Sequence, residues 1–205
     1  MRPLVRVTSN VAVLDRNDVD TDQIMPKEFL KRIERSGYGE FLFFEWMKDP
    51  LFELHRPEYQ GAEILIAGRN FACGSSREHA AWGLEDYGFR VVLAPSYSDI
   101  FRSNAVKTGL APIELSEVAL AELKAAVVET NELTVDLETM EVTHPAGLRV
   151  PFQLDDYSRE TLLHGLDDIA RTLQREDKIA AYEARRRAAV SVWAIRSPTH
   201  ARSRS

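Results

Sequence analysis

The middle of the chain alternates short apolar runs with longer segments that carry helix signals. Residues 62–68 (AEILIAG) and 90–95 (RVVLAP) are apolar runs with β-branched residues, and the segment between them has the signals of a helix. This order predicts a β-α-β unit. The pattern continues with a helix in 96–109 that ends at Gly109, a strand in 110–115, and an amphipathic helix in 116–130 that Ser116 opens.

The pattern changes after Asn131. Apolar and polar residues alternate in 132–154 around a PAG turn, which predicts β-hairpin structure, and the chain from Asp155 onward has a helical pattern that breaks near Gly165. The fold class is therefore α/β, with a mixed sheet flanked by helices and a C-terminal helical segment. We expect one domain over residues 1–187, C-terminal helices included, and a disordered basic tail over 188–205.

The region before the β-α-β unit is less regular. Residues 18–29 (DVDTDQIMPKEF) hold three acids within five positions and are interrupted by Pro26, so we expect a loop there. Residues 30–50 mix basic residues, glycines and aromatics, a composition typical of a mobile loop followed by a packed segment.

Composition and charge narrow the function. The chain has 205 residues, of which 44% are hydrophobic and 28% charged, as expected for a globular protein with a real core. Its formal net charge of -6 argues against a nucleic-acid role. The six arginines that follow Glu183 are typical of a disordered tail rather than a binding arm.

Cys73 is the only cysteine, so no disulfide forms within the chain and we expect the reducing cytoplasm. No run of apolar residues is long enough to span a bilayer, and the first residues lack the apolar core of a signal peptide. We therefore expect neither a membrane nor a secreted location.

Residues 73–79 (CGSSREH) lie where the first strand of the β-α-β unit leads into its helix. Such a loop presents backbone N–H groups to an anion, Gly74 permits close approach of a ligand, and Arg77 can hold a carboxylate through two parallel hydrogen bonds. The same letters also have a purely structural interpretation. Ser75 and Glu78 have the spacing of a capping box, and both interpretations can hold together.

Other chemistries fit this stretch less well. Ser75 is flanked by Cys73 and Arg77 where a nucleophile elbow requires glycines, and no lysine followed by Ser or Thr completes a phosphate-binding loop. The five histidines and one cysteine have no zinc-site spacing. An iron–sulfur cluster needs several thiolates, so this chain does not hold one alone.

Three motifs in order carry a family resemblance: DVDTDQIMP, GRNFACGSSREHAAWGLEDYGF and SDIFRSNAVKTGLAPIEL. They resemble the small subunits of bacterial 3-isopropylmalate dehydratases, which correspond to the swivel domain of aconitase. The resemblance extends from about Arg2 to about Arg187. It implies an aconitase-like swivelling β/β/α domain.

The resemblance also implies an activity. 2-Isopropylmalate would lose water to give isopropylmaleate, and water would return on the neighbouring carbon to give 3-isopropylmalate, a step of leucine biosynthesis. It implies a 4Fe-4S cluster held by a separate large subunit, so this chain would be one half of a heteromeric site with a hydroxy-diacid substrate. The chain alone would be inactive.

The resemblance assigns roles to residues of the second motif. Ser75 matches the catalytic base, and Ser76 and Arg77 match contacts to the substrate carboxylates. A serine hydroxyl is a weak acid, so N–H donors and the Arg77 cation would have to stabilise its anion. His79 matches a structural partner of the loop rather than a proton shuttle.

Other motifs supply further candidates. Asp22 matches an acidic residue that supports catalysis, with loop capping as the alternative, and Thr21 would shape the loop. The segment from Phe29 to Gly39 matches the stretch that contacts the variable group of the substrate. Its Arg32 and Arg35 are candidate carboxylate contacts or solvated charges. The third motif would bring Ser103, Asn104 and Lys107 near the pocket, unless they form an ordinary helix end.

Two positions depart from the family pattern. Met25 stands where isoleucine is common, and Ala72 stands where glycine is common, which restricts the backbone beside the site. The tail after about Arg187 has no counterpart. Cys73 is expected to be a small buried residue and not a cluster ligand.

Two other functions remain open at this point. The chain could be the small subunit of a related hydro-lyase, such as a homoaconitase or a methylmalate-type enzyme. It could also be a non-enzymatic module that binds anions with residues 73–79.

Overall fold

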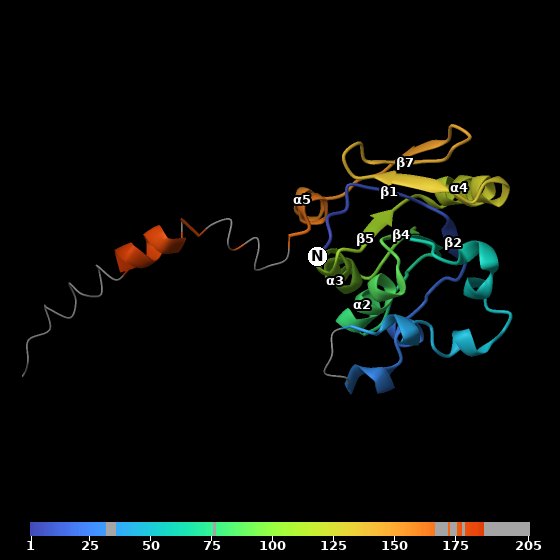
Figure 1. The fold of residues 1–205 in the computed structure, drawn as a ribbon, viewed down its shortest axis with the longest axis horizontal. Helices are drawn as coiled ribbons and strands as arrows, with labels where there is room; N and C mark the ends of the chain where they lie inside the picture. Colours follow the sequence, from blue (N-terminus) through green and yellow to red (C-terminus); the bar gives the residue numbers. More distant parts are fainter. Residues whose placement is uncertain (32–35, 76, 167–171, 173–175, 178, 187–205) are drawn as a thin grey trace, which may run out of the picture. The chain divides into compact units, whose positions relative to one another are not determined.

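The computed structural model describes the chain apart from residues 32–35, 76, 167–171, 173–175, 178 and 187–205 (Figure 1). The chain divides into two compact units, Met1–Asp167 and Asp168–Ser205. In the second unit, residues 179–186 are helical. The predicted domain boundary at residue 187 stays a prediction, and the predicted disordered tail lies outside the described residues.

A parallel sheet lies at the centre of the first unit. Its strand order is β2-β3-β4-β5, and each neighbouring pair is parallel. β3 and β4 consist wholly of buried residues, as expected for strands that are covered on both faces. The predicted β-α-β unit is therefore confirmed. The strands span Val11–Leu14 (β2), Ile64–Ala67 (β3), Val91–Ala94 (β4) and Ala111–Glu114 (β5).

An antiparallel sheet forms the second layer of strands. Its order is β1-β6-β7-β8, and the predicted hairpin structure after Asn131 supplies its last three strands. Asn10 alone separates β1 from β2, so one extended run of chain passes from one sheet to the other. The strands span Arg6–Ser9 (β1), Leu133–Asp136 (β6), Glu141–Thr143 (β7) and Arg149–Pro151 (β8).

Helices cover both faces of the parallel sheet (Figure 1). Helices α2 and α3 lie on one face, whereas α4 and the antiparallel sheet lie on the other. Ser98 caps the start of α3 and Ser116 caps the start of α4. Gly109 ends α3 and Gly165 ends α5, both in the left-handed conformation. The sequence predicted the roles of Ser116, Gly109 and Gly165. The helices span Glu78–Tyr87 (α2), Asp99–Thr108 (α3), Glu117–Glu129 (α4) and Asp156–His164 (α5).

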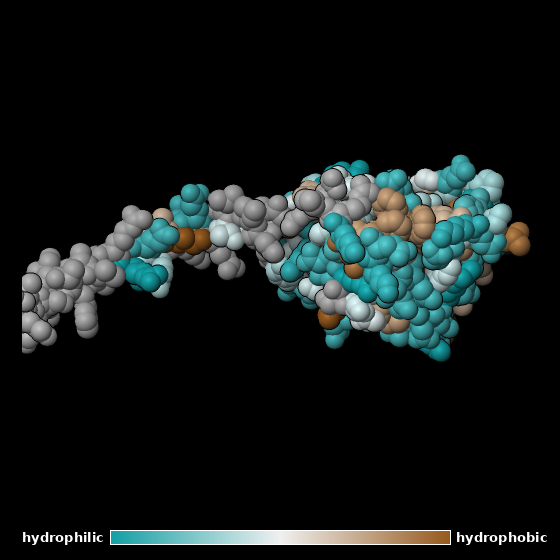
Figure 2. Space-filling view, turned by 90° about the horizontal axis from the view of Figure 1, so that it is seen from below, coloured by the Kyte–Doolittle hydropathy of each residue, from teal (hydrophilic) through white to brown (hydrophobic). Residues whose placement is uncertain are grey.

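The mixed α/β fold class is confirmed, and its parallel and antiparallel strands form two separate sheets. One apolar core fills the space between the parallel sheet and α2 and α3. A second core joins its other face to α4 and the antiparallel sheet. The face in Figure 2 is mostly hydrophilic, with one small hydrophobic patch near its upper edge and scattered hydrophobic residues elsewhere. Among the described residues, no helix is long and apolar enough to cross a membrane.

The prediction of a loop over residues 18–29 was wrong. A one-turn helix, α1 (Thr21–Ile24), begins after Asp20, and a 3-10 helix, η1 (Lys27–Lys31), follows Pro26. Asp20 and Gln23 form a capping box, in which the Asp20 side chain accepts from the Gln23 N–H and the Gln23 side chain accepts from the Asp20 N–H. Acids that indicated a loop therefore begin a helix instead.

Candidate active site

Two loops run side by side beyond the carboxyl ends of β2 and β3. The Cys73 N–H donates to the Val19 carbonyl at 3.1 Å, and the Thr21 N–H donates to the Cys73 carbonyl at 2.9 Å. The Asp18 N–H donates to the Arg69 carbonyl at 2.9 Å. These bonds continue the pairing of the two strands past their ends. The carboxyl edge of a parallel sheet is where ligands of such folds usually bind.

Thr21 fixes the backbone of the predicted base. Its side chain is 2% exposed, and its hydroxyl donates to the Ser75 carbonyl at 3.0 Å. Ser75 itself is exposed, and within the described part of the chain nothing bonds its hydroxyl. The backbone of Ser75 is thus held while its hydroxyl remains available.

Arg77 and Asp22 form an ion pair although they lie 55 positions apart in the sequence. The Arg77 side chain is 16% exposed and that of Asp22 is 52% exposed. Asp22 belongs to α1, and Arg77 is the residue that precedes α2. The structure therefore brings together four predicted site residues: Thr21, Asp22, Ser75 and Arg77.

The predicted capping box of Ser75 and Glu78 was wrong. Helix α2 begins at Glu78, its N-cap residue is Arg77, and no side chain bonds to the cap. The helix starts later than the spacing indicated because residues 71–75 are bound to the neighbouring loop instead. Ser75 is consequently not occupied as a cap.

The loop after β3 holds three residues in the left-handed region, Asn70 (φ 54°), Ala72 (φ 57°) and Gly74 (φ 92°). Alanine occupies this region at a cost, whereas glycine does not. Ala72 is fully buried, and its carbonyl accepts from the Ser98 hydroxyl at 2.7 Å. The departure from glycine noted in the sequence thus places strain three residues before the predicted base.

Cys73 is half-buried, and its thiol donates to the Asp18 carbonyl at 3.4 Å. Burial raises its pKa, and the nearby carboxylates of Asp20 and Asp18 add to the shift, so the thiol keeps its proton near neutral pH. Among the described residues, no group of three His, Cys, Asp or Glu side chains could hold a metal ion. A single protonated thiol does not fit the four-thiolate pattern of an iron–sulfur cluster.

His79 lies in the first turn of α2, within an aromatic cluster. Its ring centroid is 4.6 Å from that of Trp82 and 5.3 Å from that of Tyr38. Burial is the main cause that lowers the pKa of His79, so the ring is neutral at pH 7. Sequence reasoning did not anticipate this cluster, because Tyr38 is distant in the sequence.

Other predicted residues are not joined to these loops. Ser103 and Lys107 of α3 are exposed and Asn104 is 8% exposed, but none of the described hydrogen bonds links them to residues 71–77. Ser76, Arg32 and Arg35 lie outside the described residues, so their predicted roles stay predictions.

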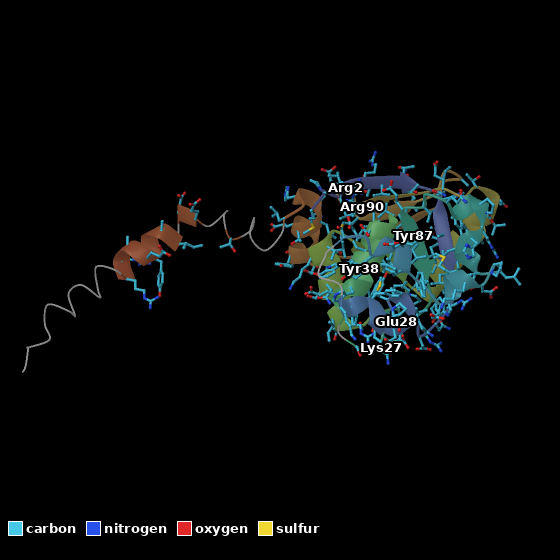
Figure 3. All side chains as sticks on the ribbon, turned by 60° about the horizontal axis from the view of Figure 1, so that its bottom comes forward. Arg2, Lys27, Glu28, Tyr38, Tyr87 and Arg90 are labelled. Atoms are coloured by element: carbon cyan, nitrogen blue, oxygen red, sulfur yellow. The ribbon has the colours of Figure 1, made fainter. Side chains whose placement is uncertain are left out.

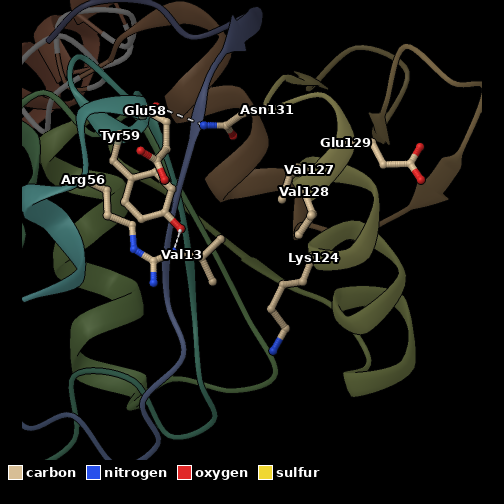
Figure 4. Close-up of a pocket in the computed structure, with 9 residues that line it drawn as sticks. All are labelled: Val13, Arg56, Glu58, Tyr59, Lys124, Val127, Val128, Glu129 and Asn131. Atoms are coloured by element: carbon tan, nitrogen blue, oxygen red, sulfur yellow. Dashed lines mark hydrogen bonds between the residues drawn. The ribbon is translucent and has the colours of Figure 1, made fainter.

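A surface pocket lies away from these loops (Figure 4). Its volume is about 570 Å³, and β2, the 3-10 helix η5 (Pro57–Tyr59) and the second half of α4 contribute to its lining. Charges of both signs line it, including Arg56, Lys124 and Glu129, and Lys124 is paired with Asp15 at 2.9 Å. It contains none of the predicted site residues.

Comparison with known proteins decides the family. Residues 1–118 match the model of the aconitase C-terminal domain, and residues 168–189 match that of the C-terminal domain of 3-isopropylmalate dehydratase small subunits. A 3-isopropylmalate dehydratase small subunit from Brevibacillus brevis is 55% identical over 91% of this chain and all of that protein. The chain belongs to this small-subunit family.

Other members of this family are also similar to the chain over most of its length. The protein of the same name from Acidobacterium capsulatum is 52% identical over 89% of this chain and 90% of that protein. The one from Bacillus subtilis is 48% identical over 91% of this chain and 97% of that protein. The crystal structure of a 3-isopropylmalate dehydratase from Methanocaldococcus jannaschii matches with a TM-score of 0.63 and 24% identity. The match covers 87% of this chain and 99% of that one. At that identity, this last match supports the fold alone.

Proposed function

We propose that this chain is the small subunit of a 3-isopropylmalate dehydratase and supplies one half of its active site. The complex would interconvert 2-isopropylmalate and 3-isopropylmalate through isopropylmaleate, in leucine biosynthesis and in the cytoplasm. Membership of the small-subunit family supports this activity. The observation that carries the proposal is the arrangement at the carboxyl edge of the sheet, where Ser75 is exposed beside the Arg77–Asp22 pair.

Ser75 is the proposed base that removes a proton from carbon. Two features support the role: an exposed hydroxyl without a described partner, and a backbone that Thr21 holds in place. A serine hydroxyl must be stabilised as its anion to act as a base. Arg77 lies two positions away and brings a positive charge to the same loop, which is the means available to this chain.

Arg77 is the proposed anchor for a substrate carboxylate. Its guanidinium has five N–H donors in a planar fork, so it can hold Asp22 on one side and a carboxylate on the other. Asp22 would fix the orientation of the fork before the substrate binds. Ser76, Arg32 and Arg35 are proposed as further contacts on the strength of the family resemblance.

A large subunit is the proposed partner, and it would carry the 4Fe-4S cluster with its thiolate ligands. The residues of this chain do not fit such a cluster, because Cys73 is its only cysteine. This chain would contribute proton transfer and carboxylate binding to the shared site.

The test is reconstitution. The chain is mixed anaerobically with a large subunit whose cluster has been loaded, and turnover of 2-isopropylmalate is compared with that of other hydroxy-diacids, including homoaconitase-type and methylmalate-type substrates. We expect turnover of 2-isopropylmalate by the mixture and by neither subunit alone. Turnover by this chain alone, or preference for another diacid, would contradict the proposal.

A further inference from the structure

Helix α2 has a notch at Gly83, and Met25 fills it. Gly83 is buried, and a Cβ atom added there would lie 2.5 Å from the Met25 Cε, a distance that real Cβ contacts do not show. The Leu42 Cδ1 and the Tyr38 carbonyl oxygen line the same notch at 3.6 and 3.7 Å. Met25 is fully buried. The end of its side chain therefore lies against the space that an alanine methyl group would need.

The chain that follows Met25 meets the same helix a second time. A Cβ atom at Gly39 would lie 2.7 Å from the Tyr87 backbone nitrogen, and the Gly39 N–H donates to the Asp86 carboxylate at 2.9 Å. Tyr38, beside it, is fully buried (Figure 3), whereas Lys27 and Glu28 lie at the outer edge of the domain. The segment after α1 is thus seated on α2 at two positions.

These contacts link the two halves of the candidate site. Met25 is the C-cap residue of α1, which carries Thr21 and Asp22, and α2 begins directly after Arg77. A helix of a single turn has little rigidity of its own, so its position depends on what it packs against. The fit of Met25 at Gly83 therefore acts together with the hydrogen bonds of Thr21 to the Cys73 and Ser75 carbonyls in setting where Asp22 meets Arg77.

We propose that Met25, seated at Gly83, is a positioning residue for the Asp22–Arg77 pair; this inference rests on the function proposed above. It also explains a departure from the family pattern. Isoleucine, which the family resemblance gives as common at position 25, ends one atom short of the methionine Cε and would leave the notch partly empty. Met25 and Gly83 form a matched pair of one long side chain and one missing side chain.

The test is the double-mutant cycle of Gly83→Ala and Met25→Ile in the reconstituted complex. In Gly83→Ala the Met25 Cε has to leave the notch, and because Met25 is fully buried we expect it to yield by moving α1. This should raise KM for the diacid and lower kcat/KM by up to about 10-fold. The thermal midpoint should fall by a few degrees at most, because the helix preference of alanine offsets part of the strain of an added methyl group in a packed notch. Met25→Ile added to Gly83→Ala should restore kcat/KM to within about twofold, because the shorter side chain makes room. Glu85→Ala, on the same helix but outside the notch, is the control.

Three results would overturn the proposal. Gly83→Ala would keep wild-type kcat/KM, or Met25→Ile would fail to rescue it, or the loss of activity would disappear once the rate is expressed per folded molecule. A crystal structure of Gly83→Ala tests the geometry without any activity. It should show the Asp22–Arg77 pair displaced, and an unmoved pair would contradict the proposal. This result does not depend on which substrate the wild-type complex turns over, so it separates a failure of this inference from a failure of the proposed function.

Discussion

Two arginines at opposite ends of the parallel sheet differ in what holds them. Arg90, just before β4, is 5% exposed, and its guanidinium donates to the carbonyls of Arg2 and Pro3 (Figure 3). Arg77, at the carboxyl edge, is bound by the carboxylate of Asp22. Burial lowers the pKa of Arg90, and its Nε has no described partner. One arginine joins the amino terminus to the core, and the other lies where a ligand can reach it.

This is the difference that we expect between a structural charge and the charge that we propose binds the substrate. The carbonyls of Arg2 and Pro3 cannot move away from Arg90 unless the amino terminus unfolds, so these donors of Arg90 are not available to a ligand. Asp22 is a half-exposed side chain, and the fork of Arg77 has donors to spare. Each substitution below should therefore affect either stability or catalysis, but not both.

The largest expected effect is that of Ser75→Ala in the reconstituted complex. Removal of a proton-transfer group should lower kcat by roughly 10²–10⁴-fold with little change in KM. Ser103→Ala, an exposed serine of α3, should leave the rate unchanged. Steady-state kinetics on 2-isopropylmalate measure both, and a Ser75→Ala rate near wild type would mean that Ser75 is not the base.

Arg77→Lys should lower kcat/KM by about 10²-fold, mainly through KM, because a lysine ammonium cannot reproduce two parallel hydrogen bonds to a carboxylate. Arg102→Lys is the matched control, since Arg102 is also ion-paired, with Glu114, but on α3. The free energy of unfolding should change little for either. Equal losses of kcat/KM for the two variants would mean that Arg77 does not bind the substrate in the proposed way.

Arg90→Met should lower stability and leave activity unchanged, the opposite of the result expected for Arg77→Lys. Two hydrogen bonds from a charged donor to the Arg2 and Pro3 carbonyls are lost, which should lower the free energy of unfolding by about 1–3 kcal/mol, with unchanged activity per folded molecule. Urea denaturation measures this loss, and Arg149→Met, at an exposed surface pair, is the control. A strong fall in kcat at full folding would show that Arg90 takes part in catalysis.

Ala72→Gly should cost the protein far less stability than a core Ala→Gly change usually does. Relief of the left-handed alanine gains about 1–2 kcal/mol, which is offset by the greater freedom of glycine in the unfolded chain and by about 0.8 kcal/mol for the lost buried methyl group, so the free energy of unfolding should stay nearly unchanged. Ala81→Gly, which is also buried but lies in the middle of α2, should lose about 1 kcal/mol or more. Thermal and urea unfolding compare the two, and equal losses for both variants would mean that the loop is not strained at Ala72.

The smallest effect concerns pH. The pKa of His79 is lowered in the folded state, so the unfolded chain takes up this proton first as the pH falls. Its stabilising contribution is complete above the unfolded pKa of about 6.5 and is lost below it. His79 is only partly buried, so we expect this change in the free energy of unfolding to be smaller than the effects of the other substitutions. The midpoint of His79→Gln should vary less than that of wild type between pH 7 and 5.5, and equal variation would contradict this account.

Local signals in the sequence predicted much of the fold. Ser116 and Gly109 define helix ends by chemistry within one turn, and the apolar runs of β3 and β4 are unambiguous. The two capping-box patterns show that such local signals are not always sufficient to predict the structure. Asp20–Gln23 and Ser75–Glu78 both have the required spacing, and only the first forms, because contacts between the two loops occupy the second.

The sequence motifs indicated the candidate residues of the site, but they did not indicate the contacts between them. Motif letters indicated Asp22 and Arg77 separately, yet their pairing depends on two loops that are far apart in the sequence. The same holds for Met25 and Gly83, where a missing side chain in one segment matches a long one in another. No local pattern carries that information. The strain at Ala72 was anticipated as a restriction, and the structure supplies its φ angle.

A competition experiment tests the central claim most directly. A fixed, limiting amount of cluster-loaded large subunit is mixed with an excess of wild-type chain and titrated with the Ser75→Ala chain, and the initial rate on 2-isopropylmalate is measured. If this chain supplies the base to a shared site, the variant should assemble normally and displace active chains, so the rate should fall in proportion to the fraction of variant. A rate that stays constant or rises as the variant is added would contradict the account.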